Sequence, residues 1–242
     1  MKIILTSLLI IVLFASCKTQ NIYEGKNAIN DKSAFKHDPN YQYKIRKDDK
    51  ISISVWGEED LSVGSIYGIY DSNEVYGKWL MVDANGNIEV PKIGTKNVLN
   101  KTVPELKEEI KIELKKWLVN PVLDIKVLNK EITVLGEVRS PNSIKVDVDN
   151  VNLLQIISKA GGFDSYADIR YVKVLRQEGK NVRVTNLDLT TNLDILNTNI
   201  TLHPGDVVIV PSKKNKEFDK RISVIIPFTT AITAAAIIIG LF

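Results

Sequence analysis

Few side chains in this chain of 242 residues have the types and spacing that catalysis or metal binding requires. There is one cysteine, and the two histidines, His37 and His203, stand far apart in the sequence. This excludes a multi-cysteine metal site and leaves little for a zinc site or a histidine-based triad. The sequence contains no Walker-type glycine-rich loop, no nucleophile elbow and no HExxH pair. We therefore expect no cofactor, no metal ion and no enzymatic activity.

Three weaker patterns have structural explanations. The acidic run at residues 58–60 could supply paired catalytic carboxylates, but adjacent side chains diverge, so a solvated loop is the better interpretation. Asp83 begins a segment similar to the start of a calcium loop, but the later bidentate glutamate is missing, which favours a turn. Trp56, Trp79 and Trp117 could stack on sugars, although aromatic residues more often lie in cores or interfaces.

The only cysteine follows a secretory signal. Residues 1–16 contain Lys2, a short apolar run and small residues at the end, which is the pattern of a signal peptide. Residues 14–17, Phe-Ala-Ser-Cys, resemble a bacterial lipobox, in which the cysteine is acylated and becomes the new N-terminus; phenylalanine stands where leucine is usual. The alternative is a plain signal peptide followed by an incidental buried cysteine. We expect Cys17 to be lipidated and the polar residues 17–40 to form a tether from the membrane surface.

The last 21 residues, 222–242, carry no charge. As a helix they would be about 31 Å long, close to the hydrocarbon thickness of a bilayer. A basic linker, residues 213–221, precedes them, and the signal peptide would place this linker in the periplasm. Basic flanks of inner-membrane helices normally stay in the cytoplasm, so an inner-membrane helix would break this rule. A helix in the outer membrane avoids the conflict. Four residues suited to helix packing or pore lining fall near one stripe: Ser223, Thr230, Thr233 and Gly240. The alternative is a simple anchor.

Between these ends the sequence predicts two small β-rich domains. Hydrophobic residues make up 44% and charged residues 25%, as in globular proteins, and the net charge of +3 is too small for an ordinary nucleic-acid binder. We expect the first domain at residues 41–129 and the second at residues 130–212. The fold class is α+β: two small β-rich domains followed by a single C-terminal transmembrane helix.

In the first domain, residues 51–56 alternate as a strand does, and residues 57–79 form a polar insertion. A capping-box pattern starts a helix at Thr102 that continues to about residue 118. We expect this helix to carry Leu106, Ile110, Leu114 and Trp117 on one face.

The second domain shows strands around one short helix, at residues 152–159, which suggests a β-grasp-like arrangement. Turn-forming residues separate the elements of both domains: Asp49, Gly86, Pro91, Gly94, Gly136, Gly161, Gly162, Gly205 and Asp206. Residues 46–53 also echo residues 202–209, each as a turn, an acid and then a strand, although any turn into a strand shares that outline.

The order of these motifs resembles a known family. Residues 43–51, residues 82–94 (VDANGNIEVPKIG) and the Asn-Pro-Val at 120–122 resemble the polysaccharide export domain of outer-membrane polysaccharide export lipoproteins. Residues 136–141 (GEVRSP), 160–163 (AGGF) and 204–211 (PGDVVIVP) resemble the soluble-ligand-binding β-grasp (SLBB) domain that follows it. In this chain Asp48 replaces a usual glycine, and Asn142 stands where glycine follows proline.

The resemblance implies a polysaccharide substrate, such as a capsule or exopolysaccharide. It also implies a homo-oligomeric ring whose C-terminal helices line an opening through the outer membrane, and an inner-membrane polysaccharide co-polymerase, of the tyrosine-kinase type or similar, as the partner. We expect passive transport of polymer made and pushed from the inner membrane. The alternative is a periplasmic glycan-binding or scaffolding lipoprotein without a conducting pore.

Overall fold

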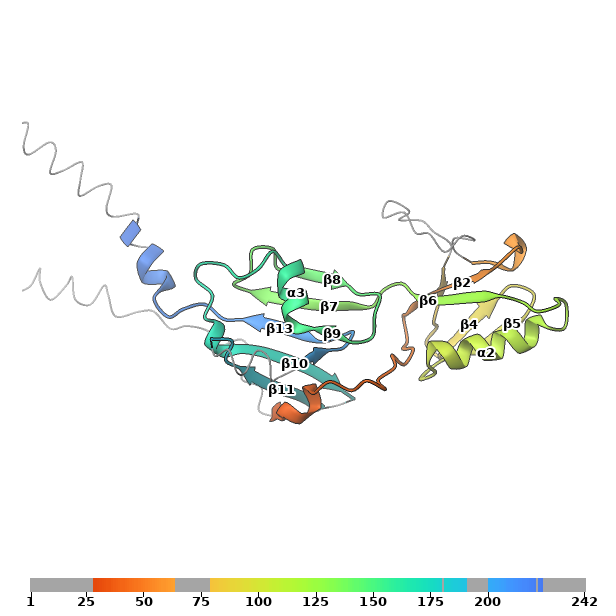
Figure 1. Ribbon diagram of the computed structural model, residues 1–242, viewed down its shortest axis with the longest axis horizontal. Coiled ribbons are helices and arrows are strands. Elements are labelled where there is room, and N and C mark those ends of the chain that lie inside the picture. Colours follow the sequence, from red (N-terminus) through yellow and green to blue (C-terminus); the bar gives the residue numbers. More distant parts are fainter. Residues whose placement is uncertain (1–27, 64–78, 180, 191–199, 221, 224–242) are drawn as a thin grey trace, which may run out of the picture.

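The computed structural model describes residues 28–63, 79–179, 181–190, 200–220 and 222–223, and Figure 1 shows their arrangement. Two β-rich domains lie next to each other along the long axis of the molecule, joined by the segment between β6 and β7 (Figure 1). Four residues of the predictions lie outside the described part: Cys17, Thr230, Thr233 and Gly240.

The first domain contains a three-stranded antiparallel sheet in the order β3-β2-β6, together with the β4–β5 hairpin and helix α2. The elements are β2 (Lys50–Val55), the 3-10 turn η2 (Glu59–Leu61), β3 (Leu80–Met81), β4 (Asn87–Val90), β5 (Gly94–Asn97), α2 (Val103–Leu114) and β6 (Leu123–Val127). Ile51, Ile53 and Val55 of the central strand are buried in one apolar core with residues of α2. The strand predicted at residues 51–56 is therefore present, one residue earlier.

Helix α2 begins as its sequence predicts. The Thr102 hydroxyl accepts the backbone N–H of Glu105, and the Glu105 carboxylate accepts the backbone N–H of Thr102 at 2.7 Å. Leu106, Ile110 and Leu114 are buried. The predicted helix end at about residue 118 was wrong: the helix ends at Leu114, and Trp117 lies in the following turn with its side chain 54% exposed.

The second domain is built on a mixed six-stranded sheet in the order β1-β11-β10-β13-β7-β8. Helix α3 packs over β7 and β9, and β9 pairs with β12 (Figure 1). The elements are β7 (Glu131–Gly136), β8 (Asn142–Lys145), β9 (Val151–Asn152), α3 (Leu153–Lys159), the 3-10 turn η3 (Ile169–Tyr171), β10 (Val172–Glu178), β11 (Asn181–Leu187), β12 (Thr201–Leu202) and β13 (Val207–Val210). The expectation of two β-rich domains with few helices is confirmed.

The segment before the first domain belongs structurally to the second. Strand β1 (Ala28–Asn30) pairs in parallel with β11, and the 3-10 turn η1 (Lys32–Phe35) buries Phe35 completely in the core of the second domain. Asp31 also forms an ion pair with Arg183 of β11. These residues therefore do not form the irregular tether expected for residues 17–40, because Phe35 and the strand pairing fix them; residues 17–27 lie outside the described part.

The basic linker leaves the second domain at the end opposite the first domain, where residues 216–220 and 222–223 are helical (Figure 1). Lys216 forms an ion pair with Glu137, and the Lys213 ammonium donates to the carbonyl of Ser165 at 3.0 Å. The Ser223 hydroxyl donates to the carbonyl of Lys220 at 2.8 Å. Within the described residues, no helix has the length and apolar character needed to span a membrane.

Candidate functional site

Two equivalent turns, residues 46–49 and 203–206, lie at the boundary between the domains. In each, the third residue has a left-handed backbone, with φ of 65° in the first turn and 96° in the second. In each, the closing aspartate, Asp49 or Asp206, accepts the backbone N–H of the first residue at 2.8 Å. The echo between the two sequences therefore corresponds to one shared turn, in which the carboxylate satisfies a backbone donor.

The two turns contact each other. The guanidinium of Arg46 lies so close to Gly205 that a Cβ atom at that position would be 2.8 Å from Nη1. The ring of Tyr41 stacks on His203, with centroids 3.5 Å apart and an angle of 6° between the planes. Gly205 is thus needed for its positive φ, whereas the end of the flexible Arg46 side chain could shift to make room for a Cβ atom.

A second set of contacts crosses the same boundary through Asp149. One carboxylate oxygen of Asp149 accepts the backbone N–H of Tyr43 at 3.0 Å, and the other accepts the ammonium of Lys130 at 2.8 Å. The hydroxyl of Tyr43 in turn donates to both carboxylate oxygens of Asp49, at 3.0 and 3.1 Å. Because these groups are wholly or partly buried and hydrogen-bonded, they favour one relative orientation of the domains.

Burial determines the electrostatics of this junction. It raises the pKa of Asp206 above the ordinary value, against the opposing effect of the Arg176 guanidinium, which donates from Nε and Nη2 at 2.9 and 2.7 Å. Burial likewise raises the pKa of Asp49 and that of Tyr43. The pKa of His203 is lowered to about 4 by burial and by the charge of Arg176, so its ring is neutral at pH 7. The carboxylates of Asp49 and Asp206 stabilise their turns, and Asp206 also neutralises the buried Arg176 guanidinium. Both carboxylates therefore have a structural role.

His203 is expected to make the folded protein sensitive to acid. Since its pKa is about 4 when folded and 6.5 ordinarily, the unfolded chain binds more protons between these values, so stability falls as the pH drops from 6.5 towards 4. His203→Phe keeps a ring against Tyr41 and removes the titration. Thermal unfolding at pH 7 and pH 5 should show a smaller loss of Tm for this variant than for the wild type, whereas equal losses would contradict the assignment. Asp49 and Asp206 are present in both the wild type and the His203→Phe variant, so their titration does not account for a difference in the loss of Tm between the two.

The remaining predicted turn residues lie outside the junction. Gly86, Pro91 and Gly94 lie in or beside the β4–β5 hairpin of the first domain, and Gly136, Gly161 and Gly162 lie in the second. All five of these glycines have positive φ. Asp83 is a turn residue, because its carboxylate accepts the backbone N–H groups of Asn85 and Asn87, each at 2.8 Å. Sequence reasoning did not single out Tyr41, Lys130, Asp149 or Arg176, whose partners are distant in sequence.

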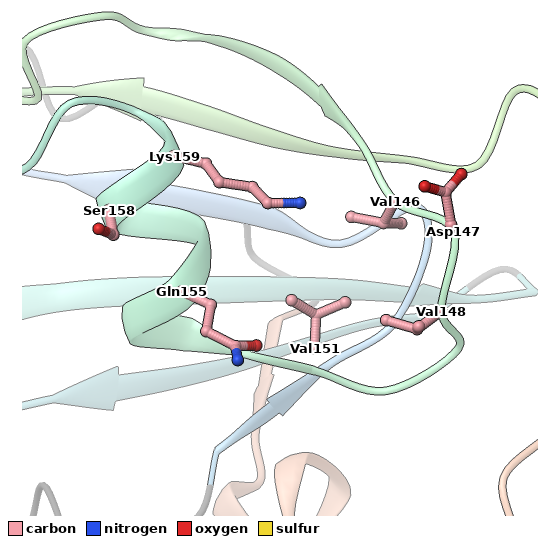
Figure 2. A pocket seen from close by; sticks show the side chains of 7 residues that line it. All are labelled: Val146, Asp147, Val148, Val151, Gln155, Ser158 and Lys159. Atoms are coloured by element: carbon pink, nitrogen blue, oxygen red, sulfur yellow. The ribbon is translucent and has the colours of Figure 1, made fainter. Parts of the chain in front are cut away.

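A cavity of about 340 Å³ opens in the second domain between α3 and the loop that follows β8 (Figure 2). Its lining combines three valines with four polar residues: Val146, Val148, Val151, Asp147, Gln155, Ser158 and Lys159. No motif in the sequence indicated this site, because the lining comes from one loop and one helix face that acquire their proximity only on folding.

Several exposed apolar residues occupy the end of the first domain that points away from the second (Figure 1). Trp56 is 58% exposed. Its backbone N–H donates to the carbonyl of Val122 at 2.9 Å, so Trp56 and Val122 are neighbours. Trp117 and Val119 lie in the same loop between α2 and β6, and Val119 is 94% exposed. We call Trp56, Trp117, Val119 and Val122 the apolar end. Trp79 differs, because the Lys50 ammonium lies 4.5 Å from the centre of its ring.

Comparison with known proteins identifies both domains. Residues 37–128 match the family described as polysaccharide biosynthesis/export protein, and residues 130–210 match the SLBB domain. The chain contains a polysaccharide export domain followed by an SLBB domain. Its export domain is the first domain of the structure, and its SLBB domain is the second.

Two proteins similar to this chain come from Ralstonia and Neisseria. The chain is 28% identical over 191 residues to the EPS I polysaccharide export outer membrane protein EpsA of Ralstonia solanacearum, covering 73% of this chain and 50% of the relative. It is 30% identical over 131 residues to the capsule polysaccharide export outer membrane protein CtrA of Neisseria meningitidis serogroup A, covering 53% of this chain and 33% of that protein. The chain thus spans about half the length of EpsA, and less of CtrA.

Proposed function

We propose that this chain is an outer-membrane component that exports a capsular or extracellular polysaccharide. The observation that carries the proposal is the succession of an export domain and an SLBB domain, in a chain similar to two proteins named for polysaccharide export at the outer membrane. The mechanism is passive: the protein supplies a passage, and synthesis at the inner membrane supplies direction. No residue is assigned a catalytic role.

In this proposal the chain is anchored at the outer membrane and its bulk lies in the periplasm. Lipidation of Cys17 would supply one attachment, and a helix at residues 222–242 a second. The described residues are consistent with this arrangement, because the basic linker leaves the SLBB domain at the end opposite the export domain (Figure 1). A membrane at that end would leave the export domain extending into the periplasm.

The functional unit in this proposal is a homo-oligomeric ring. A single helix cannot enclose an opening, whereas several helices together form a closed wall in which every backbone hydrogen bond is satisfied. Small and hydroxyl residues near one stripe of the predicted helix suit close packing or a weakly polar lining: Ser223, Thr230, Thr233 and Gly240. The Lys216–Glu137 ion pair would hold each helix in a fixed position relative to its SLBB domain.

The inner-membrane partner in this proposal is a polysaccharide co-polymerase, of the tyrosine-kinase type or similar, that contacts the apolar end. Tryptophan is enriched at protein interfaces compared with the rest of a surface, and contiguous exposed apolar patches mark interaction sites. The apolar end lies at the far side of the export domain from the basic linker, where a protein reaching from the inner membrane would arrive (Figure 1).

Complementation distinguishes a conducting ring from an anchored scaffold. In a strain lacking this protein, the intact chain should restore surface polysaccharide. The variant carrying Thr230→Leu and Thr233→Leu should restore about one tenth of that amount or less, because the stripe loses two of its three hydroxyl groups. Immunoblots of membrane fractions check that the variant is present in equal amount. Full restoration by the variant would favour the scaffold, and failure of the intact chain to restore surface polysaccharide would contradict the export function.

A further inference from the structure

The cavity of the SLBB domain has the shape and chemistry of a small binding site. Its volume of about 340 Å³ falls in the range of small-molecule pockets. Figure 2 shows the methyl groups of Val146, Val148 and Val151 on one side and the amide of Gln155 beside Val151. Val148 is 59% exposed and supplies most of the accessible apolar surface, whereas Val146 and Val151 are buried and lie beneath it as the floor.

The loop that forms one wall of the cavity is held in place before any ligand arrives. The backbone N–H of Val146 donates to the carbonyl of Lys130 at 2.9 Å. The ammonium of Lys130 donates to the carbonyl of Asp147 at 3.1 Å and to the carboxylate of Asp149 at 2.8 Å. The loop is thus tied to the domain junction, and binding would require little ordering of the backbone.

The polar rim has free capacity for hydrogen bonds. Within the described residues, the side chains of Asp147, Ser158 and Lys159 form no hydrogen bond or ion pair with another protein group. The amide oxygen of Gln155 accepts the backbone N–H of Asn152, which leaves its NH₂ group to donate. The rim therefore offers a carboxylate acceptor, an ammonium donor, an amide donor and a hydroxyl.

The balance of charge indicates the class of ligand. One carboxylate and one ammonium cancel, so the rim favours neither an anion nor a cation. Both donors and acceptors are nevertheless present beside an apolar wall of methyl groups. A pyranose ring matches this combination, because it is uncharged, has a face of C–H groups and carries hydroxyls that both donate and accept.

We propose that this cavity binds one neutral hexopyranose unit, with the C–H face of the sugar against Val148 above the floor formed by Val146 and Val151, and its hydroxyls on Asp147, Gln155 and Lys159. The inference rests on the proposed export function, since it takes the sugar from the exported polymer. An open cavity of this size gives weak binding, with a dissociation constant on the order of 1–10 mM. Weak binding at one site per subunit would guide a polymer without arresting it.

The test is an NMR titration of the full chain in lipid nanodiscs, with valine methyl groups labelled. Detergents with sugar headgroups are avoided because they would compete. The probes are the methyl β-pyranosides of glucose, galactose and mannose, with glucuronate as the charged comparison. At least one neutral probe should give saturable shifts of the Val146, Val148 and Val151 methyls below about 100 mM.

Matched variants locate the site. Asp147→Asn and Lys159→Gln should each weaken binding by about tenfold, because each alters a charged hydrogen-bonding group. Lys145→Gln, which changes an exposed lysine of β8 outside the cavity lining, should leave binding unchanged. All three residues are exposed, so the variants should fold.

Three results would overturn the proposal: no saturable shift with any neutral probe, binding of glucuronate alone, or equal weakening by Lys145→Gln. If the protein shows no sugar binding but still restores surface polysaccharide, the proposed sugar site is wrong and the export function stands. Saturable binding in a protein whose deletion leaves surface polysaccharide unchanged would support the site and contradict the export function.

Discussion

Replacing Asp206 with alanine is expected to lower the stability of the SLBB domain by about 3–5 kcal/mol, the range typical when one partner of a buried ion pair is removed. Asp206 is 2% exposed and accepts two hydrogen bonds from Arg176, at 2.9 and 2.7 Å, and one from the backbone of His203. The variant leaves the Arg176 guanidinium buried without its counter-charge.

Arg176 extends this effect beyond one turn. Its guanidinium also donates to the carbonyl of Ala34 at 2.6 Å and to the carbonyl of Thr201 at 3.0 Å, so it joins the N-terminal segment to β12 of the second domain. Loss of Asp206 should therefore loosen the packing of η1 as well as the turn at residues 203–206. Hydrogen exchange of the full chain should show reduced protection in β10, β13 and η1.

The surface pair between Arg183 and Glu178 supplies the matched control. Both side chains are more than a third exposed, and exposed ion pairs contribute about 0–1 kcal/mol. Glu178→Ala should thus change amide protection little. If Asp206→Ala reduced the protection of β10 and β13 no more than Glu178→Ala does, the pair between Arg176 and Asp206 would not have the structural importance assigned to it.

Replacing Gly136 with alanine should destabilise the same domain by about 3–4 kcal/mol. Gly136 has φ of 93°, where a Cβ atom is strained, and that atom would overlap the carbonyl oxygen of Val210. The obstacle is backbone: Gly136 and Val210 are paired in the parallel ladder of β7 and β13, and Val210 accepts the N–H of Glu137 at 2.9 Å. Relief of the overlap would require separating two central strands.

Gly162→Ala separates the cost of backbone strain from the cost of the overlap with Val210. Gly162 also has a positive φ, of 84°, but a Cβ atom there would meet nothing within 4 Å. Its replacement should cost only about 1 kcal/mol from backbone strain. Thermal unfolding of both variants of the full chain compares them directly. Equal losses of Tm would show that backbone conformation alone accounts for the cost, contrary to the overlap with Val210.

Local signals in the sequence predicted much of the local structure. Helix α2 was expected because Thr102, Pro104 and Glu105 form a complete start signal, and the structure contains the corresponding hydrogen bonds. Trp117 shows the limit of that reasoning: apolar spacing continues past Leu114, where the helix ends, so Trp117 was placed on a helix face although it lies in the following turn. Periodicity identifies a face only while the helix continues.

Pairings between distant segments could not be predicted in the same way. Strand β1 has three residues and pairs with β11 more than 150 positions later, so no alternation pattern indicates it. The contacts at the domain junction also join residues that are distant in sequence: 106 positions separate Tyr43 from Asp149, and 30 separate Arg176 from Asp206. The sequence did single out the two turns, since an aspartate before a strand is a local signal, but not that the folded chain brings them together.

The location of polysaccharide in a strain lacking this protein tests the central claim most directly. Surface and periplasmic polysaccharide would be measured in that strain, and again after complementation with the intact chain and with a chain ending at Arg221. Our account predicts that polymer is lost from the surface and that only the intact chain restores it. Restoration by the shorter chain would reduce the helix to an anchor. Unchanged surface polysaccharide, in a host with no second protein of this family, would contradict the export function.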